Sequence, residues 1–451
     1  MSEPGGVSEP GGVSEPGGVS ERGGVSERGD QDEPATRSVT VTEGQSEQSD
    51  WSEFRAQMSE WREGVERRLP PWWGRALAGA LILIGVVLPF FFSADSGFVS
   101  ATIEAVAYAV MALGLNIVVG FAGLLDLGYV AFYALGAYSW GWFASGFFYK
   151  AHVHVLVSPV ASTLPGIHLN VILVLAAAAI ICALAGMLIG LPTLRLRGDY
   201  IAIVTLAFGE IIGVVAVNGT SIHLGGGMTL TAGNLGISGV DSPYFPGVGL
   251  FNELNLRPWY WLILGVLLLV LFVNLRLRDS RLGRAWVALR EDEVAAVSMG
   301  IPLVRTKLMA YSIGAAFGGM AGAFFGTYLT VINAEQFQFG FSIFILGMVI
   351  IGGLGSIWGA VAGGLLLGYI NYYLIPDVLN SLPSKIGLHF QLTEVEYGIY
   401  GFLLVIMMLL RPQGLIPERR RKLELTRGIG ETELAEPGTS WTEVEPEEVG
   451  R

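Results

Sequence analysis

Long apolar segments alternate with short polar breaks between residues 76 and 411 of this chain. Most of them approach the ~20 residues that a helix needs to cross ~30 Å of hydrocarbon. The pattern predicts an all-α polytopic membrane protein with about ten transmembrane helices, in a range of 8–11. The range reflects Gly-rich breaks at 120–128 and 352–355, which are either loops or unwound points within a span. The ten segments are about 76–92, 98–119, 127–148, 170–191, 201–218, 258–275, 308–331, 337–353, 356–375 and 396–411.

The positions of Lys and Arg predict the orientation of these spans. If both termini lie in the cytoplasm, 24 of the 27 basic residues fall in cytoplasmic segments. Only Lys150, Arg257 and Lys385 fall outside them. Basic residues concentrate on the cytoplasmic side of membrane proteins. We therefore expect an even number of spans, cytoplasmic termini and a place in a bacterial or archaeal inner membrane.

Composition agrees with this class, because the chain is 52% hydrophobic and only 15% charged. Soluble proteins carry about a quarter charged residues. The net charge of -12 belongs mainly to the ends, since 15 of the 39 acidic residues precede Trp72 and 9 follow Pro417. It argues for solvation of the ends and not for a cationic partner. We expect no nucleic acid among the partners. The one cysteine, Cys182, excludes an intrachain disulfide.

The two ends differ from the apolar middle. Residues 1–50 begin with a SEPGGV repeat, whose Pro, Gly and charge cannot form a core, so we expect a disordered tail and no cleavable signal peptide. Residues 51–75 carry one apolar stripe and a basic, aromatic collar, which predicts a helix lying at the membrane interface or against a partner protein. We expect residues 76–416 to form the transmembrane domain and 417–451 an acidic disordered tail. The stripe consists of Trp51, Phe54, Met58, Trp61 and Val65.

No catalytic motif is visible in the sequence. It has no G-x-x-x-x-G-K-[ST] phosphate loop, so the chain is not expected to hydrolyse ATP itself. Three of the five histidines fall in the segment 150–169, without the spacing of metal ligands, and are expected to be loop residues. No Ser-His-Asp arrangement is apparent. We expect no enzyme activity, no metal and no cofactor.

The segment from Arg276 to Lys307 is too structured for a plain connector between spans. Its apolar positions Trp286, Leu289, Val294 and Val297 fit one face of a single helix of about four turns. Gly300 and then Pro302 would end that helix. Such a helix suits docking into a groove of a soluble partner, and the alternative is an inert surface helix. Its candidate docking residues are Arg290, Glu291, Asp292, Glu293, Ala295, Ala296 and Gly300.

Polar groups are rare in the apolar segments, and each is costly in lipid unless it faces a cavity or a partner. Asn116, Asp126 and Glu210 are therefore candidates for the translocation pathway or gate. Glu210 would lie near mid-membrane, as a pathway group or as a polar lock between two permease subunits. The alternative is a carboxyl group held by the hydroxyls and backbone of a neighbouring helix.

Four stretches of the chain are similar to a known family. The segment GRAWVALREDEVAAVSMGI resembles the cytoplasmic E-x-A-A-x-x-x-G loop of ABC importer permeases, with Glu293, Ala295, Ala296 and Gly300 at the motif positions. More specifically, the chain resembles the LivM-type permease of branched-chain amino-acid ABC importers over about residues 76–416. The stretches are 114–138, 194–212, 278–293, and 352–359 with 411–415. One departure is the outer loop TAGNLGI (231–237), where Ala232 and Asn234 replace the family's usual turn residues.

The resemblance implies an all-helical permease in a heterodimer with a second, homologous permease. Two ATP-binding subunits would dock on the cytoplasmic side, and an external solute-binding protein would deliver the cargo. In that reading the helix from Glu293 to Gly300 transmits closure of the ATPase dimer to the spans. Urea, short amides and, more distantly, sugars are alternative substrates within the class. An alternative of another class is a stand-alone secondary transporter or channel.

Overall fold

The computed structural model describes residues 79, 83–194, 196, 200–223, 228–245, 247, 249–252, 254–379, 395–411 and 413–417. All of them belong to the compact unit Leu77–Arg451. The expected tail 1–50, the interfacial helix 51–75 and residues 418–451 of the acidic tail lie outside the described residues. So do three basic residues that enter the orientation argument, Arg195, Arg197 and Lys385.

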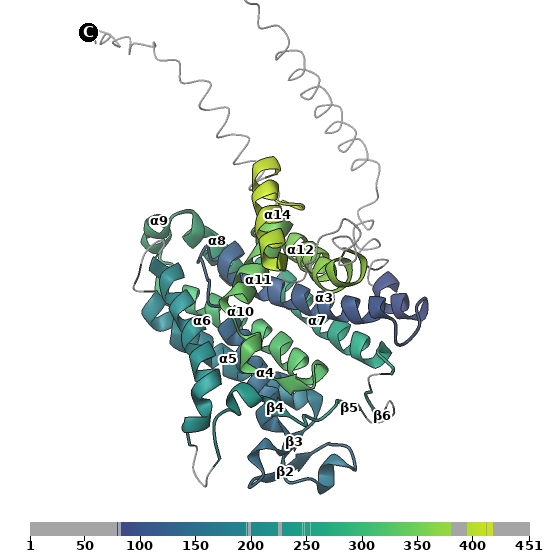
Figure 1. The fold of residues 1–451 in the computed structure, drawn as a ribbon. Helices are drawn as coiled ribbons and strands as arrows, with labels where there is room; N and C mark the ends of the chain where they lie inside the picture. The colour runs from purple at the N-terminus through teal and green to yellow at the C-terminus, as the bar shows by residue number, and fades with distance from the viewer. Residues whose placement is uncertain are drawn as a thin grey trace, which may run out of the picture. The chain divides into compact units, whose positions relative to one another are not determined.

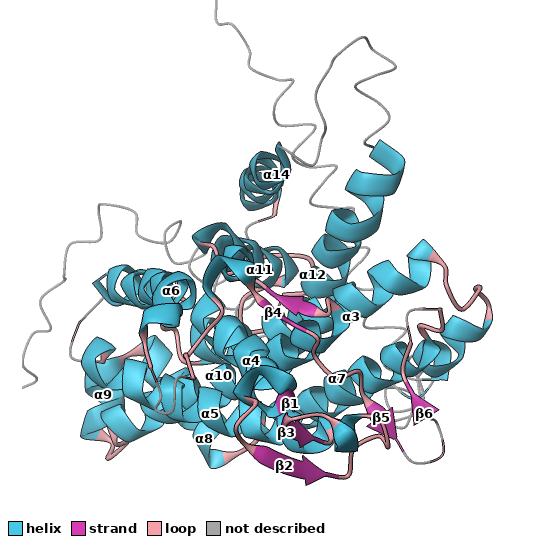
Figure 2. Cartoon of the chain, turned by 60° about the horizontal axis from the view of Figure 1, so that its bottom comes forward, coloured by secondary structure: helices cyan, strands magenta, loops and turns pink. Residues whose placement is uncertain are grey.

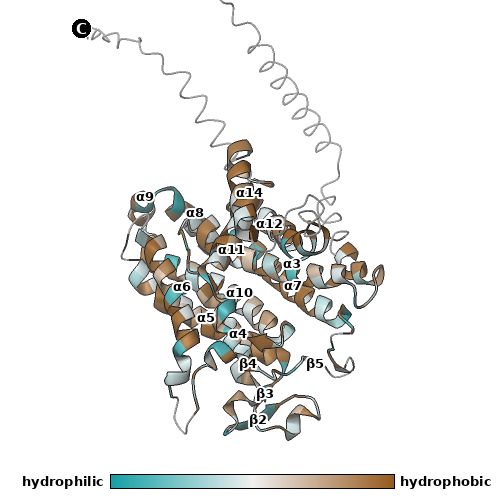
Figure 3. Cartoon of the chain, viewed as in Figure 1, coloured by the Kyte–Doolittle hydropathy of each residue, from teal (hydrophilic) through white to brown (hydrophobic). Residues whose placement is uncertain are grey.

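The described part of the chain is mostly helical, and seven of its helices are long and apolar enough to cross a membrane. Figure 1 shows them side by side, and Figure 3 shows how hydrophobic residues dominate their surfaces. Two shorter helices are α4 (Val130–Phe143) and α14 (Glu396–Leu410), so the expected span at 127–148 is only 14 helical residues long. The seven are built on α3 (Gly97–Leu115), α5 (Val171–Thr193), α6 (Tyr200–Asn218), α7 (Arg257–Arg278), α10 (Leu303–Tyr328), α11 (Phe339–Gly352) and α12 (Ile357–Tyr369).

Short helical turns extend or connect these helices. The π-helix η2 (Asn116–Phe121) continues α3, and the π-helix η8 (Ile370–Leu379) continues α12. Both predicted Gly-rich breaks are real interruptions, because helical structure stops at Phe121 and again at Gly352. The 3-10 turns are η1 (Leu88–Phe90), η3 (Gly146–Phe148), η4 (Ala161–Thr163), η5 (Gly219–Ser221), η6 (Gly233–Leu235) and η7 (Ala334–Gln336).

Helix starts follow the capping chemistry of the sequence. The Ser96 hydroxyl accepts from the Val99 amide and starts α3, and the Asn170 side chain accepts from the Ile172 amide and starts α5. Ser356 starts α12 in the same way, through the Gly359 amide. These side chains satisfy amides that have no partner within the helix, which fixes each helix start.

The centre of the bundle is α3 and α10, which are the most deeply buried of the long helices. Helix α10 packs against α3, α4 and α5, and α12 packs against α3. Close approach depends on glycine: a Cβ at Gly322 would lie 2.1 Å from the carbonyl oxygen of Tyr133, and one at Gly136 2.2 Å from that of Gly319. Small residues at such crossings let membrane helices touch backbone to backbone.

Short strands cluster at the opposite end from α8 and α9, as Figure 1 shows, and Figure 2 marks them in magenta. The all-α expectation missed them, because each has only two to four residues and forms through partners distant in sequence. Strand β3 (Gly166–Leu169) pairs antiparallel with β1 (Ala144–Ser145) and parallel with β2 (His152–Val155). The other pairs are antiparallel: β4 (Ile237–Ser238) with β7 (Val331–Ile332), and β5 (Tyr244–Phe245) with β6 (Gly249–Leu250).

Candidate functional site

The predicted docking segment forms two helices, α8 (Arg281–Glu291) and α9 (Glu293–Ser298). The Ser280 hydroxyl caps α8 by accepting from the Gly283 amide. Helix α8 buries Trp286 and Leu289, and the Trp286 indole donates to the carbonyl oxygen of Thr306 at 2.7 Å. Because Thr306 lies in the first turns of α10, this bond fixes α8 to a membrane helix.

The expectation of one continuous amphipathic helix was wrong. Asp292 has an extended backbone, with φ -152° and ψ 111°, and its carboxylate accepts from the amides of Val294 and Ala295. It therefore ends α8 and caps α9. The break turns Val294 and Val297 away from the buried face of α8, leaving them 77% and 46% exposed. Periodicity alone could not show this, because Asp is compatible with a helix interior and with a cap.

Helix α9 presents an apolar surface to the outside of the protein. Ala296 is buried and Ala295 is exposed. Met299, just after the helix, is 84% exposed. Gly300 ends the helix with φ +86°, and the amides of Gly300 and Ile301 donate back to Val297 and Ala296. This left-handed C-cap explains why glycine stands at the position.

Glu293 and Arg290 of the segment each bind a residue of another helix. Glu293 pairs with Lys307 at the start of α10, where Lys307 is only 3% exposed. Glu293, a candidate docking residue, therefore already has a basic partner within this chain, and its side chain is 45% exposed. Charge reversal at Glu293 would leave a buried ammonium group unpaired and would disturb the permease itself. The Arg290 guanidinium donates from Nη1 to the carbonyl oxygen of Gly120 at 2.5 Å. Within the acidic run 291–293, the side chains of Glu291 and Asp292 are exposed and form no ion pair with another described residue.

Asn116 lies at the start of the π-helix η2 and is fully buried. Its Oδ1 accepts from the Gly355 amide at 2.9 Å, which joins the end of α3 to the break between α11 and α12. Its Nδ2 finds no hydrogen-bond partner among the described residues. A π-turn inside a helix is rare and is common at functional sites.

The break between α11 and α12 is covered by the segment that follows α14. The amides of Leu415 and Ile416 donate to the carbonyl oxygens of Ile351 and Gly352 at 2.8 and 3.0 Å. Gly353 has φ +122°, and a Cβ at Gly414 would lie 2.5 Å from its Cα. The two motifs at 352–359 and 411–415, distant in sequence, thus form one turn.

Asp126 stabilises the other Gly-rich break, at 120–128. It is 1% exposed, and its Oδ1 accepts from the Gly128 amide at 2.9 Å. The Leu127 amide donates to the Thr205 hydroxyl of α6 at 3.1 Å. Residues from all four motif stretches therefore meet around the ends of α3, α6, α8 and α11. We use the name junction for the Arg290–Gly120, Asn116–Gly355, Leu127–Thr205 and Leu415–Ile351 contacts.

Glu210 does not lie at the junction core. Its neighbour Gly209 packs toward Gly128, whereas Glu210 belongs to an exposed stripe of α6. A carboxylate among apolar residues of a membrane helix is costly when it faces lipid. The stripe consists of Ile203, Ala207, Glu210, Val214 and Val217.

At the strand-bearing end, a buried pair holds the outer loops together. His168 Nδ1 and Asp241 Oδ2 are 2.5 Å apart, and the His154 ring stacks on His168. Burial raises the pKa of the Asp241 carboxyl, and the hydrogen bond from His168 opposes this rise. His152, His154 and His168 lie in strands, so the expectation that they are loop residues was wrong. The loop 231–237, whose sequence departs from the family's usual one, still forms a turn, because Gly233 and Gly236 take positive φ.

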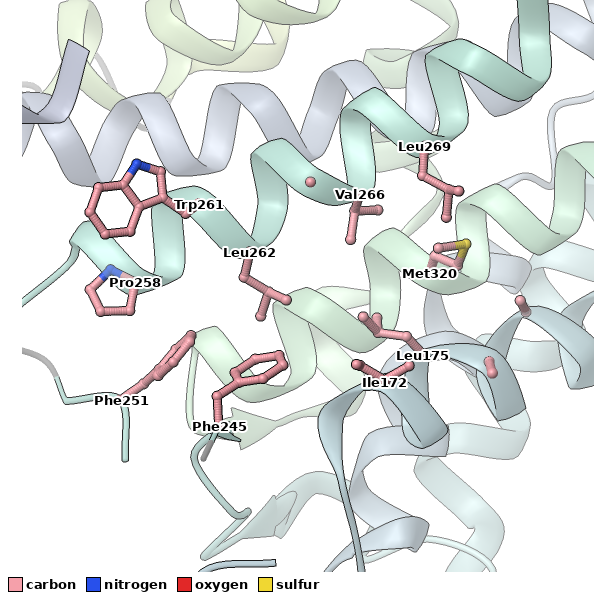
Figure 4. A pocket seen from close by; sticks show the side chains of 13 residues that line it. Ile172, Leu175, Phe245, Phe251, Pro258, Trp261, Leu262, Val266, Leu269 and Met320 are labelled. Atoms are coloured by element: carbon pink, nitrogen blue, oxygen red, sulfur yellow. The ribbon is translucent and has the colours of Figure 1, made fainter. Parts of the chain in front are cut away.

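A large open pocket of about 650 Å³ lies between α5, α7 and α10. Figure 4 shows its lining, which includes Phe245, Phe251, Trp261 and Met320. The Trp261 indole, the one side-chain donor in this lining, is directed to the carbonyl oxygen of Val86. The lining therefore offers no charged side chain and no free side-chain N–H or O–H donor, and we do not assign the pocket to a polar cargo.

Three of the contact residues, Lys307, Thr205 and Gly120, were not predicted as site residues from the sequence. Lys307 and Thr205 are ordinary for the ends of membrane helices, and Gly120 contributes only a carbonyl group. Their partners lie 14, 78 and 170 residues away, so no local spacing could pair them.

Comparison with known proteins gives a consistent result. Residues 97–408 match the family described as the permease component of branched-chain amino acid transport systems. The chain is 35% identical over 380 residues to the high-affinity branched-chain amino acid transport system permease protein LivM of Salmonella typhimurium, covering 79% of this chain and 78% of that protein. It is 25% identical over 329 residues to a probable LivM of Methanocaldococcus jannaschii, covering 69% and 91%.

A second type of permease also matches. The LivH permease of Escherichia coli strain K12 is 33% identical over 159 residues, which is 35% of this chain and 46% of that protein. No solved structure matches the chain significantly. The match over most of the long helices and the LivM identity give one conclusion: the chain belongs to the permease family of branched-chain amino acid transport systems.

Proposed function

We propose that this chain is one of two permease subunits of an ATP-driven importer for branched-chain amino acids in a bacterial or archaeal cytoplasmic membrane. The observation that carries the proposal is helix α9, whose exposed apolar residues are linked to α10 by the Glu293–Lys307 pair. An apolar surface outside the bilayer fits a protein partner. One of the two ATP-binding subunits is the partner that would use it, and the chain itself supplies no ATP chemistry.

Substrate class follows from the relatives, whose names specify branched-chain amino acids. The test is uptake of labelled leucine by cells that carry this chain together with the second permease, the ATPases and the binding protein. Excess valine and isoleucine are expected to suppress the signal, and excess urea is not. Suppression by urea alone would contradict the substrate assignment. The binding protein would approach the end of the permease that carries the short strands.

The second permease is proposed to cover the exposed stripe of α6. Glu210 would then be shielded from lipid and would meet a polar group of the partner or of the pathway. Glu210→Gln is expected to lower leucine uptake several-fold while the ATPases stay bound. The matched control is Asp279→Asn, which removes an exposed carboxylate that pairs with the neighbouring Arg278, and its uptake should stay near that of the original chain. Equal uptake by both variants would remove Glu210 from pathway and interface.

We also propose ten spans with both termini in the cytoplasm. The described helices supply seven candidates, and α4, α14 and the segment that includes 83–91 are proposed as the remaining three. Reporter fusions after residues 191, 300 and 416 should read cytoplasmic, and fusions near 160, 240 and 385 external. A cytoplasmic signal from the 219–257 loop would contradict this topology.

A further inference from the structure

Besides the Trp286 bond to α10, helix α8 contacts residues 120–123 through the long side chain of Arg290. The Arg290 head group donates to the Gly120 carbonyl oxygen, and a Cβ at Gly123 would lie 2.7 Å from Arg290 Cγ. Both the stem and the head of Arg290 are therefore held by residues 120–123. Gly120 belongs to the last turn of η2, where carbonyl groups have no amide partner within the helix. A guanidinium group is a strong donor for such a carbonyl.

Beyond Gly120, the same close packing continues to Asn116 and Gly355. A Cβ at Gly120 would lie 2.1 Å from Asn116 Oδ1 and 2.7 Å from the Gly355 amide nitrogen. Asn116 in turn holds that same amide by a hydrogen bond of 2.9 Å. A movement of η2 must therefore move the turn at Gly355 with it, because tightly packed atoms cannot absorb a displacement.

The path runs through two local breaks in the helices, and the first of them holds a polar group with no partner in the described part of the chain. Asn116 keeps a buried Nδ2 without a partner among the described residues, although buried amide groups normally bond fully. Gly353 and Gly355 both take positive φ, +122° and +82°, in the turn that ends α11. The π-helix and the glycine turn are local breaks where backbone angles change at low cost.

We propose that Arg290, the Gly120 carbonyl, Asn116 and the Gly355 amide form a relay that transmits movement of α8 and α9 to the two helix breaks. Arg290 is thus a positioning residue for transport and not a contact for the ATPases. The inference rests on the proposed function, since it needs ATPases that push on α9. A mere structural brace would hold the same residues together, but it would not set how much ATP is used for each molecule imported.

The test compares variants of the complete importer in proteoliposomes, with ATP hydrolysed per leucine imported as the readout. Arg290→Ala is expected to keep both ATPases bound, lower uptake roughly tenfold, as befits one lost charged hydrogen bond, and raise the ATP-to-leucine ratio. Arg290→Lys retains a charged donor and should give an intermediate ratio. Arg284→Ala is the matched control, because this arginine of α8 is exposed and bonds only to Asp279 of its own segment.

Asn116→Ala should raise the ratio as well, and the double variant should be no worse than the more severe single one. An unchanged ratio in Arg290→Ala or Arg290→Lys would overturn the relay. Loss of the ATPases from Arg290→Ala would also overturn it, by making Arg290 a docking contact. If Arg290→Ala fails to insert, the ratio of Arg290→Lys decides. An original complex that imports leucine without ATP would instead refute the proposed function, so the two failures remain distinct.

Discussion

Val294→Asp is expected to release the ATPase subunits and to abolish uptake while the permease stays in the membrane. Val294 is 77% exposed on α9 and belongs to its first turn, where a carboxylate interacts favourably with the helix dipole. The substitution should therefore leave the fold intact. At the docking surface it would place a charge against an apolar contact, and the loss of one such anchor costs about 2 kcal/mol or more in binding.

The measurement is the amount of ATPase that co-purifies with tagged permease, beside leucine uptake in the same cells. Val153→Asp supplies the control for ATPase binding, because Val153 is 45% exposed but lies in β2 at the opposite end of the helices. Normal ATPase recovery with Val294→Asp would mean that α9 is not the docking surface. Val294→Ala should fall between the two.

Gly322→Val is expected to remove most folded permease from the membrane. Its Cβ would lie 2.1 Å from the carbonyl oxygen and 2.9 Å from the carbonyl carbon of Tyr133. These are backbone atoms of α4, so α10 and α4 would have to separate. Overpacking of a tight core costs about 1–3 kcal/mol and more where the backbone itself is in the way.

Yield of monodisperse protein and its thermal midpoint in detergent measure this effect. Gly265→Val is the matched control, since a Cβ at Gly265 of α7 has no atom within 4 Å. It should behave like the original chain. Equal midpoints for the two variants would contradict the close α4–α10 crossing.

Hydropathy and glycine positions predicted the long helices and both breaks, because each depends on residues close together in sequence. The sequence likewise predicted that Gly300 ends the docking helix, and Gly300 ends α9. The division of this helix at Asp292 was not predicted, because an Asp side chain is compatible with a helix interior and with an N-cap. Which of the two forms depends on tertiary contacts such as the Trp286–Thr306 hydrogen bond. The short strands were also missed, because β4 finds its partner β7 only through the packed helices.

The candidate site shows the same division. The segment 276–307 and Asn116 were found from sequence, because charge or amide groups near apolar spans are conspicuous. What they contact was not predicted: Glu293 meets Lys307, Arg290 meets Gly120, and Asn116 meets Gly355. Two of these contacts use backbone groups, which every residue carries, so the side-chain pattern holds no information about them.

ATP dependence of leucine uptake is the measurement that tests the central claim most directly. This chain, the second permease, the two ATPases and the binding protein are reconstituted into liposomes, and labelled leucine is followed with and without ATP on the ATPase side. The account predicts accumulation only with ATP and only when the ATPases are present, and none with Val294→Asp. Accumulation by this chain alone, driven by an ion gradient and indifferent to ATP, would contradict it.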